Sequence, residues 1–217
     1  MFRLIHLKYF YIFCFFLFSC SYLIARPVSY PGGWTVMQMN GWELSRFHVH
    51  YSFQKTDSLG VNVEKYHDFD RMNYHIQWNR LIQRRNTRYS QANLYLKLQS
   101  GFAFQVKEFS PGVSLGVAGD WETRRYFVSY GAMCAYAGLI EPGSFHQQAR
   151  FGIAPYIGDY GSLHTWLMVQ FEHHPYELDP QVVWVVMPML RLFKGVYLIE
   201  LGLNDNMKVI FNWVIRF

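Results

Sequence analysis

The sequence contains little cysteine, little charge and few long apolar runs. Its 217 residues include three cysteines, Cys14, Cys20 and Cys134, a number that provides no disulfide framework. Only 16% of the residues are charged and 19% are aromatic, which excludes a disordered chain. Apolar runs near the roughly 18 residues of a membrane-spanning helix occur only at the N-terminus. This excludes a polytopic helical membrane protein.

The N-terminus has the features of an export signal. Arg3 and Lys8 form a basic start, and the run from Tyr9 to Phe18 is apolar but short for a membrane span. We predict a signal peptide over residues 1–25, cleaved near Ala25, and a single domain over residues 26–217. A lipoprotein processed at Cys20 and an uncleaved anchor helix over residues 9–25 are the alternatives. An exported protein without disulfides must be stabilised by its core or by a membrane.

The charge balance gives no sign of a nucleic-acid partner. The chain has 20 Lys and Arg against 15 Asp and Glu, a net charge of +5 that falls to about +3 without the signal. The one concentrated basic patch, at residues 80–88, fits a solvated turn. Motifs for nucleotides and structural zinc are missing, so we expect no cofactor.

Apolar and polar residues alternate with a period of two from Trp34 onward. In RFHVHYSF (46–53) one face holds Phe47, Val49, Tyr51 and Phe53, while the other holds polar residues. The same separation recurs in NYHIQWN (73–79) and ANLYLKLQ (92–99). Alternation of this kind predicts β-strands and explains how a chain with 51% apolar residues has a mean hydropathy of −0.03.

Turn signals rich in Gly, Pro, Asn and Asp divide the mature chain into about twelve strands, with ten as the alternative. The predicted ranges are 36–40, 45–54, 59–66, 71–82, 91–106, 112–120, 124–136, 146–157, 163–173, 182–193, 196–203 and 208–217. This all-β pattern predicts a closed antiparallel up-and-down transmembrane β-barrel. A soluble β-sandwich is the alternative.

The last strand favours the membrane barrel. In KVIFNWVIRF the residues Phe211, Trp213, Ile215 and Phe217 share one apolar face, and the sequence ends at Phe217. This segment resembles the C-terminal assembly signal of bacterial outer-membrane proteins. The resemblance implies recognition by the barrel-assembly machinery, a location in the bacterial outer membrane, and contact with its lipid and lipopolysaccharide.

A wider resemblance covers most of the mature chain. The segments PGGWTVMQMN, RRYFVSY, DYGSLHTWLM and LRLFKG resemble an exported proteobacterial family of predicted outer-membrane proteins. The resemblance implies the same location and no particular activity.

The polar faces predict the contents of the barrel interior. An even number of strands with a periplasmic N-terminus places residues 138–144 and 175–180 outside the cell and the turn at Lys194 and Gly195 inside. Charged residues facing a barrel of about twelve strands would pair and largely fill it, which excludes a wide porin. We therefore predict that the barrel has a structural role, a binding role or a role in the passage of small solutes. The predicted lumen-lining residues are His48, His50, His75, His164, Arg150, Arg191 and Glu200.

Two alternatives assign chemistry to the same polar faces. His50, Ser52 and Glu64, or Asn62 in place of Glu64, resemble the nucleophilic sites of lipid A deacylases and the outer-membrane phospholipase. A hairpin turn centred on Thr56 would place His48 opposite Glu64 and His50 opposite Asn62. His48 and His50, two apart on one strand, could instead contribute two ligands to a metal. We favour neither catalysis nor metal binding over a polar lining.

Overall fold

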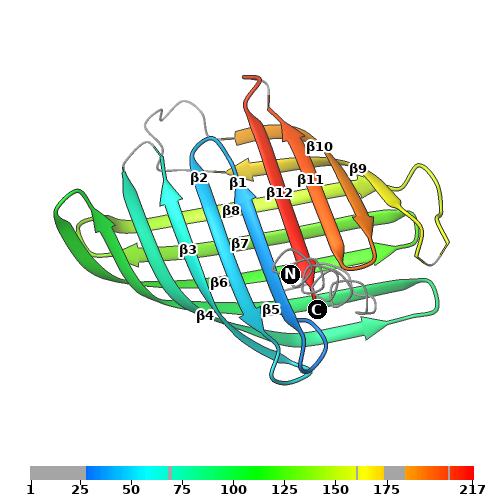
Figure 1. Ribbon diagram of the computed structural model, residues 1–217, viewed down its shortest axis with the longest axis horizontal. Helices are drawn as coiled ribbons and strands as arrows, with labels where there is room; N and C mark the ends of the chain where they lie inside the picture. The colour runs from blue at the N-terminus through cyan, green and yellow to red at the C-terminus, as the bar shows by residue number, and fades with distance from the viewer. Residues whose placement is uncertain (1–27, 68–69, 160, 174–183, 205) are drawn as a thin grey trace, which may run out of the picture.

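The computed structural model describes residues 28–67, 70–159, 161–173, 184–204 and 206–217, and these residues form one closed barrel (Figure 1). Each strand pairs antiparallel with its sequence neighbours, and β1 closes the barrel against β12. The strands are β1 (Trp34–Asn40), β2 (Leu44–Tyr51), β3 (Asp57–Tyr66), β4 (Arg71–Asn86), β5 (Ser90–Gln105), β6 (Glu108–Thr123), β7 (Tyr126–Ala137), β8 (Glu141–Ile153), β9 (His164–His173), β10 (Trp184–Lys194), β11 (Tyr197–Leu203) and β12 (Val209–Arg216).

The predicted fold is therefore confirmed, including the count of about twelve strands. The predicted signal peptide over residues 1–25, with its cleavage site and Cys20, lies outside the described residues. In the described part of the chain, no helix is long and apolar enough to cross a membrane.

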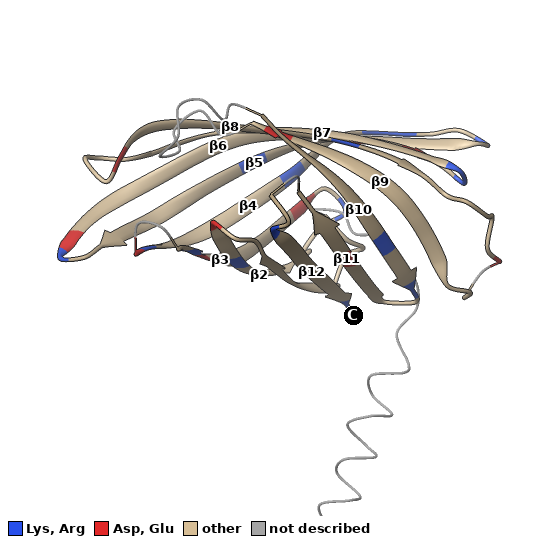
Figure 2. Cartoon of the chain, turned by 90° about the horizontal axis from the view of Figure 1, so that it is seen from above, with Lys and Arg blue, Asp and Glu red and all other residues tan. Residues whose placement is uncertain are grey.

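Alternation along each strand separates an apolar exterior from a mostly polar interior. In β12, Phe211 is 39% exposed whereas its neighbour Asn212 is 2% exposed. On β5, Leu98 points outward between the inward residues Lys97 and Gln99. Figure 2 shows few charged residues along the strands and more of them at the turns. An apolar outer surface over most of the wall is what a lipid environment requires.

The two ends of the barrel differ in the segments that they carry. We call the end with Trp34, Phe217 and the turns at 52–56, 87–89, 124–125, 154–163 and 195–196 the terminal end. The opposite end, with the connections at 41–43, 106–107, 138–140 and 204–208, is the loop end. Gly138 and Gly195 thus lie at opposite ends, as the sequence predicts. The segment 175–180 lies outside the described residues.

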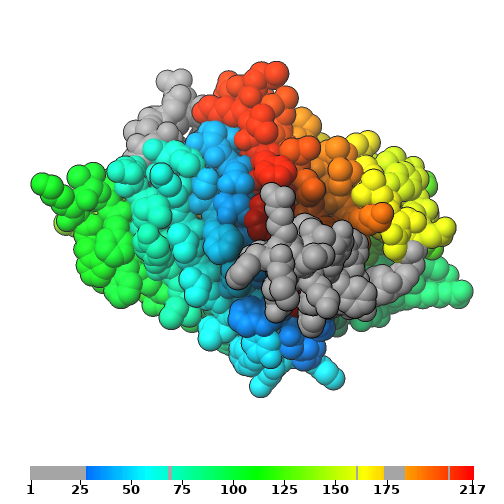
Figure 3. Space-filling view, viewed as in Figure 1, coloured from blue at the N-terminus to red at the C-terminus, as the bar shows by residue number. Residues whose placement is uncertain are grey.

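The barrel wall is uneven in length. The strands β4, β5 and β6 have 16 residues each, whereas β1 and β11 have seven. In Figure 1 the short strands β1, β2, β11 and β12 cross in front of these long strands. Figure 3 shows the closure on this face, where the blue N-terminal strands lie beside the red and orange C-terminal strands.

Two of the gaps between predicted strands are too long, because residues 110–111 and 141–143 lie within β6 and β8. Pro111 is tolerated since pairing of β6 with β7 starts only at Val113, so that at Pro111 the strand has β5 alone beside it. Near Pro142 the pairing of β7 and β8 shifts register between Ala135 and Ala137. Turn residues at sheet edges and bulges do not interrupt a strand.

Candidate functional site

A cavity of about 1120 Å³ occupies the half of the lumen nearest the loop end. Its lining comes from the loop-end portions of the strands and from connections such as 41–43 and 106–108. Charged and amide side chains line it beside a smaller apolar set that includes Trp42, Val185 and Ile210. A cavity of this size is large enough for a small molecule.

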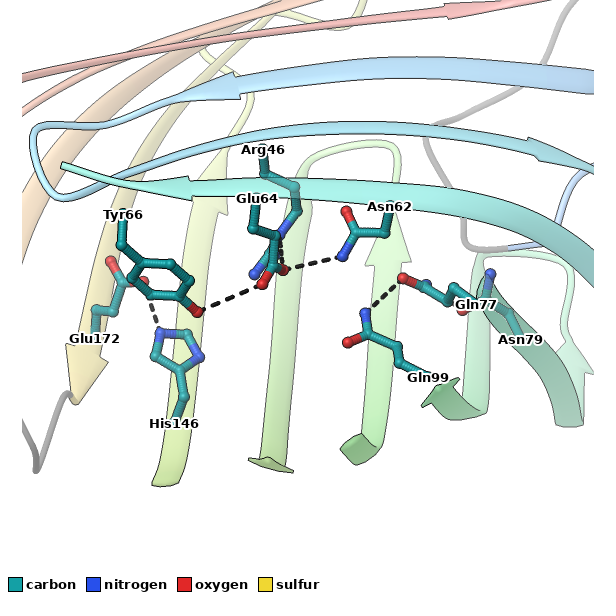
Figure 4. A network of polar contacts seen from close by, with 9 residues as sticks. All are labelled: Arg46, Asn62, Glu64, Tyr66, Gln77, Asn79, Gln99, His146 and Glu172. Atoms are coloured by element: carbon teal, nitrogen blue, oxygen red, sulfur yellow. Dashed lines mark hydrogen bonds and ion pairs between the residues drawn. The ribbon is translucent and has the colours of Figure 1, made fainter. Parts of the chain in front are cut away.

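One wall of the cavity is organised around the carboxylate of Glu64 on β3. Arg46 Nε on β2 donates to Glu64 Oε1 at 2.7 Å, and Asn62 Nδ2 donates to the same oxygen at 2.9 Å. Tyr66 donates its hydroxyl to Oε2 at 3.4 Å (Figure 4). Arg71 stacks over the Tyr66 ring, with its guanidinium carbon 3.8 Å from the ring centre. The carboxylate is held by three donors and is therefore rigid.

A second cluster on the wall formed by β8 to β12 surrounds Glu200. Arg191 Nη2 lies 2.7 Å from Glu200 Oε1, Arg150 Nη1 lies 3.3 Å from both carboxylate oxygens, and Asn212 Nδ2 donates to Oε2 at 3.0 Å. Arg150 Nε also donates to Gln170 at 2.6 Å. Two arginines thus share one carboxylate.

The network extends from Gln170 toward the loop end. Gln170 Nε2 donates to Glu172 Oε2 at 2.9 Å, and Glu172 Oε1 lies 2.9 Å from His146 Nε2, a pair drawn in Figure 4. These side chains face the cavity from β8 and β9. A solute entering from the loop end would therefore meet both hydrogen-bond donors and acceptors.

A chain of amides crosses the wall at mid-lumen. Gln99 donates to Gln77 at 2.7 Å, Gln77 to Asn79 at 2.6 Å, and Asn79 to Ser58 at 3.0 Å. Gln99 lines the cavity, and Figure 4 shows its bond to Gln77. The side chains of Asn79 and Ser58 are buried and lie farther toward the terminal end along β4 and β3. These hydrogen-bonded side chains are buried and project from the wall into the lumen at this level.

Lys97 is a mid-lumen cation that pairs with none of the described residues. It faces inward on β5, opposite Asn79 on β4 and Gly116 on β6. The charges of Arg46 and Arg150 act on it, and both are positive. Arg46 and Arg150 each pair with a carboxylate, whereas Lys97 forms no ion pair or hydrogen bond with any of the described residues. No described residue therefore pairs with its positive charge.

Apolar side chains line the interior from the terminal half of the lumen to the loop-end cavity, which Val185 also lines. Phe127, Met168, Val185, Met187 and Met189 form a buried cluster on β7, β9 and β10. Trp166 packs against this cluster and faces inward. Sequence alternation could not find this cluster, because Val185, Met187 and Met189 lie on a strand whose two faces are both apolar.

The predicted lumen-lining residues take different positions in the interior. His48 and His50 are buried and joined by a 2.9 Å contact between His50 Nδ1 and His48 Nε2. His75 is buried and lines the cavity, and His164 lies at the terminal end of β9, 6.1 Å from the Phe193 ring centre. Arg150, Arg191 and Glu200 form the second cluster. Sequence analysis did not identify Tyr66, which donates to Glu64 on the same strand, or Asn212, which donates to Glu200 on the neighbouring strand.

The predicted hairpin pairing for the hydrolase alternative is wrong by two residues. His48 pairs with Asn62, His50 with Gly60, and Glu64 with Arg46. The turn is centred on Lys55 rather than Thr56 because β3 begins at Asp57, two residues earlier than predicted. Glu64 is consequently engaged by Arg46 instead of a histidine.

Ser52 is likewise engaged elsewhere. Its Oγ accepts a hydrogen bond from the Ser29 backbone at 2.9 Å, and no hydrogen bond between described residues joins Ser52 to His50. A serine nucleophile requires a base within hydrogen-bond reach, and this arrangement does not provide one. The described residues also contain no group of three or more His, Cys, Asp or Glu placed to hold a metal ion. The structure does not assemble the residues of either alternative into a site.

The C-terminal strand lies at the barrel seam. Phe211, Trp213 and Ile215 face outward, and Phe217 donates its backbone N–H to Trp34 O at 3.0 Å. Trp34 and Phe217 thus extend the pairing of β1 with β12 by one step beyond Thr35 and Arg216. The role of this strand as an assembly signal stays a prediction.

Comparison with known proteins gives relatives in structure but not in sequence. No family model and no curated protein matches the sequence. The KdgM porin shares 6% identity and a TM-score of 0.51, over 85% of this chain and 98% of that chain. KdgM porin in complex with disordered oligogalacturonate matches over the same shares at 6% identity with a TM-score of 0.50. The chain therefore has the closed β-barrel fold of bacterial outer-membrane porins.

Proposed function

We propose that the protein is a narrow outer-membrane pore that passes small anionic solutes. The apolar exterior and the fold are consistent with an outer-membrane location. The cavity at the loop end is large enough to admit a small solute, and its amide and charged lining replaces the hydration of a polar molecule. KdgM is named a porin, and its similar fold supports a role of this protein in solute passage.

The proposal that the solute is anionic rests on Lys97. A charge inside a narrow lumen interacts strongly because few waters screen it. In the clusters described above, Arg46, Lys97, Arg150 and Arg191 are four cations, whereas Glu64, Glu172 and Glu200 are three carboxylates. An anionic group of the solute would compensate Lys97 on its way through the barrel. The same positive centre would repel cations.

The buried side chains at mid-lumen predict slow passage of solutes. Asn62, Asn79 and Ser58 are fully buried, and His50 is 1% exposed. A twelve-stranded barrel has a small interior, and side chains at this level leave a constriction instead of an open channel. We expect a conductance well below that of a sixteen-stranded porin.

Ion selectivity in planar bilayers tests this function. The purified barrel would be reconstituted under a gradient of KCl, and the reversal potential would give the ratio of chloride to potassium permeability. We expect a preference for chloride in the parent. Lys97→Gln should reduce it severalfold, because the uncompensated charge is removed.

Lys65→Gln is the matched control, since Lys65 lies on the outward face of β3. This variant should keep the parent's selectivity. Equal selectivity in parent and Lys97→Gln would contradict the role of Lys97, and the absence of conductance in the parent and in every variant would contradict a pore.

A further inference from the structure

We infer that residues 28–33, which precede β1, form a plug that closes the terminal mouth of the lumen, and that its withdrawal opens the path. We call this segment the N-terminal plug. The proposed function concerns the cavity at the loop end and the mid-lumen constriction. The N-terminal plug lies at the opposite end, so it adds a separate point of control.

Backbone hydrogen bonds fix the N-terminal plug to the end of β2. Gly32 N donates to Ser52 O at 2.8 Å, and Ser52 N donates to Gly33 O at 2.9 Å. Gly33 N donates to Tyr30 O at 3.0 Å, which closes a turn. Gly32 has a φ of +84°, a conformation that glycine adopts without strain. This turn directs the preceding residues back over the mouth of the barrel.

Val28 and Ser29 carry the segment into the lumen. Ser29 N donates to the buried Ser52 Oγ at 2.9 Å. Val28 is 1% exposed and clusters with Leu81 on β4 and Tyr95 on β5, with Ala118 on β6 packed against them. The N-terminal plug therefore bridges the lumen between β2 and the wall formed by β4 to β6.

Other apolar side chains in the terminal half belong to the wall itself. Phe127, Met168, Met187 and Met189 lie on strands that pair on both sides, so they cannot leave without unfolding the barrel. Residues 28–33 precede the first strand and belong to no strand of the barrel, and they are joined to the wall through Val28 and through hydrogen bonds to Ser52. Segments outside the paired sheet open at lower free energy than the core, which stays folded.

Thiol accessibility tests the N-terminal plug without relying on conductance. Ala118→Cys would be introduced into a Cys134→Ser background, and the folded barrel would be treated with a small charged thiol reagent. In the parent sequence we expect slow labelling, because Ala118 packs against the cluster that includes Val28. Adding Val28→Asp should accelerate labelling severalfold, since a carboxylate is not accommodated against Leu81 and Tyr95.

A second cysteine distinguishes plug opening from general loosening. Ala135→Cys in the same background lines the loop-end cavity, and its labelling should be equal with and without Val28→Asp. If Val28→Asp left labelling at position 118 unchanged, or accelerated it equally at position 135, the inference would be overturned. Val28→Gly provides a milder variant, in which the same selective acceleration is expected if Val28→Asp fails to fold.

Conductance then relates the plug to passage. Val28→Asp should raise the conductance severalfold, whereas Tyr89→Asp, in an exposed turn at the same end of the barrel, should not change it. Faster labelling at position 118 with no conductance in any variant would contradict the pore and leave the plug supported. Conductance in the parent with unchanged labelling would contradict the plug alone.

Discussion

Arg150 on β8 contacts Glu200 on β11 inside the barrel, with its Nη1 3.3 Å from both carboxylate oxygens. The contact passes over β9 and β10, and Arg191 on β10 joins the same carboxylate. All three side chains are buried or nearly so. The pair therefore ties strands that are not neighbours and fixes the shape of the lumen at mid-height.

Glu200→Gln should lower the free energy of unfolding by about 3 kcal/mol, because it leaves two buried arginines without their carboxylate. Urea unfolding of the reconstituted barrel, followed by gel mobility without heating, measures this loss. Glu108→Gln, at an exposed position, should change the value by less than about 0.5 kcal/mol. Similar losses in both variants would show that the Glu200 cluster adds nothing to stability.

Substitutions on the two faces of β5 should have unequal costs. Leu98→Arg places a charge against lipid and should cost about 2 to 4 kcal/mol at mid-membrane depth. Gln99→Arg, one residue away, points into the cavity and should cost clearly less. The same unfolding measurement compares them. Equal losses of unfolding free energy in the two variants would indicate a protein that is not surrounded by lipid.

Gly101→Ala should prevent the pairing of β4 with β5. A Cβ at position 101 would lie 1.8 Å from the Tyr74 backbone oxygen and 2.8 Å from His75 Cα, so the strands would have to separate. Gly131→Ala is the control, since its nearest atom would be 3.8 Å away. We expect little heat-modifiable barrel for the first variant and normal amounts for the second. Normal folding of both would contradict the close approach at Gly101.

Deletion of Phe217 should strongly reduce the amount of assembled barrel in the outer membrane. The deletion removes the terminal aromatic residue of the predicted assembly signal and a backbone pairing with Trp34. Phe217→Tyr keeps both features and should assemble normally. Cell fractionation with gel mobility before and after heating measures both. Wild-type assembly of the truncated protein would refute the assembly signal.

The lipid hydrolase alternative predicts turnover that depends on Ser52 and His50. Because Ser52 binds Ser29 and Glu64 binds Arg46, we expect no release of label from phospholipid or lipid A by the purified protein. Ser52→Ala and His50→Ala serve as matched variants. Turnover in the parent that vanished in both variants would overturn the pore as the main function.

The sequence alone determined the strands and their two faces. The outward positions of Phe47, Val49 and Tyr51 could be predicted, because alternation is a property of a single extended strand and needs no knowledge of its neighbours. The same reasoning placed His48, His50 and Glu200 in the interior. It failed on β10, where Met187 and Met189 face inward and both faces are apolar, so alternation carries no signal.

Only the tertiary structure decided which interior residues meet. Because the turn between β2 and β3 is centred one residue earlier than predicted, Glu64 lies opposite Arg46 instead of a histidine. Closure of the barrel brings Arg150 to Glu200. In the closed barrel, Lys97 forms no ion pair with a described residue, and Val28 packs against Tyr95. Contacts across a barrel depend on the register of every strand between them, since a change of one turn displaces all later pairs. That register is a property of the closed barrel and is not contained in any single strand.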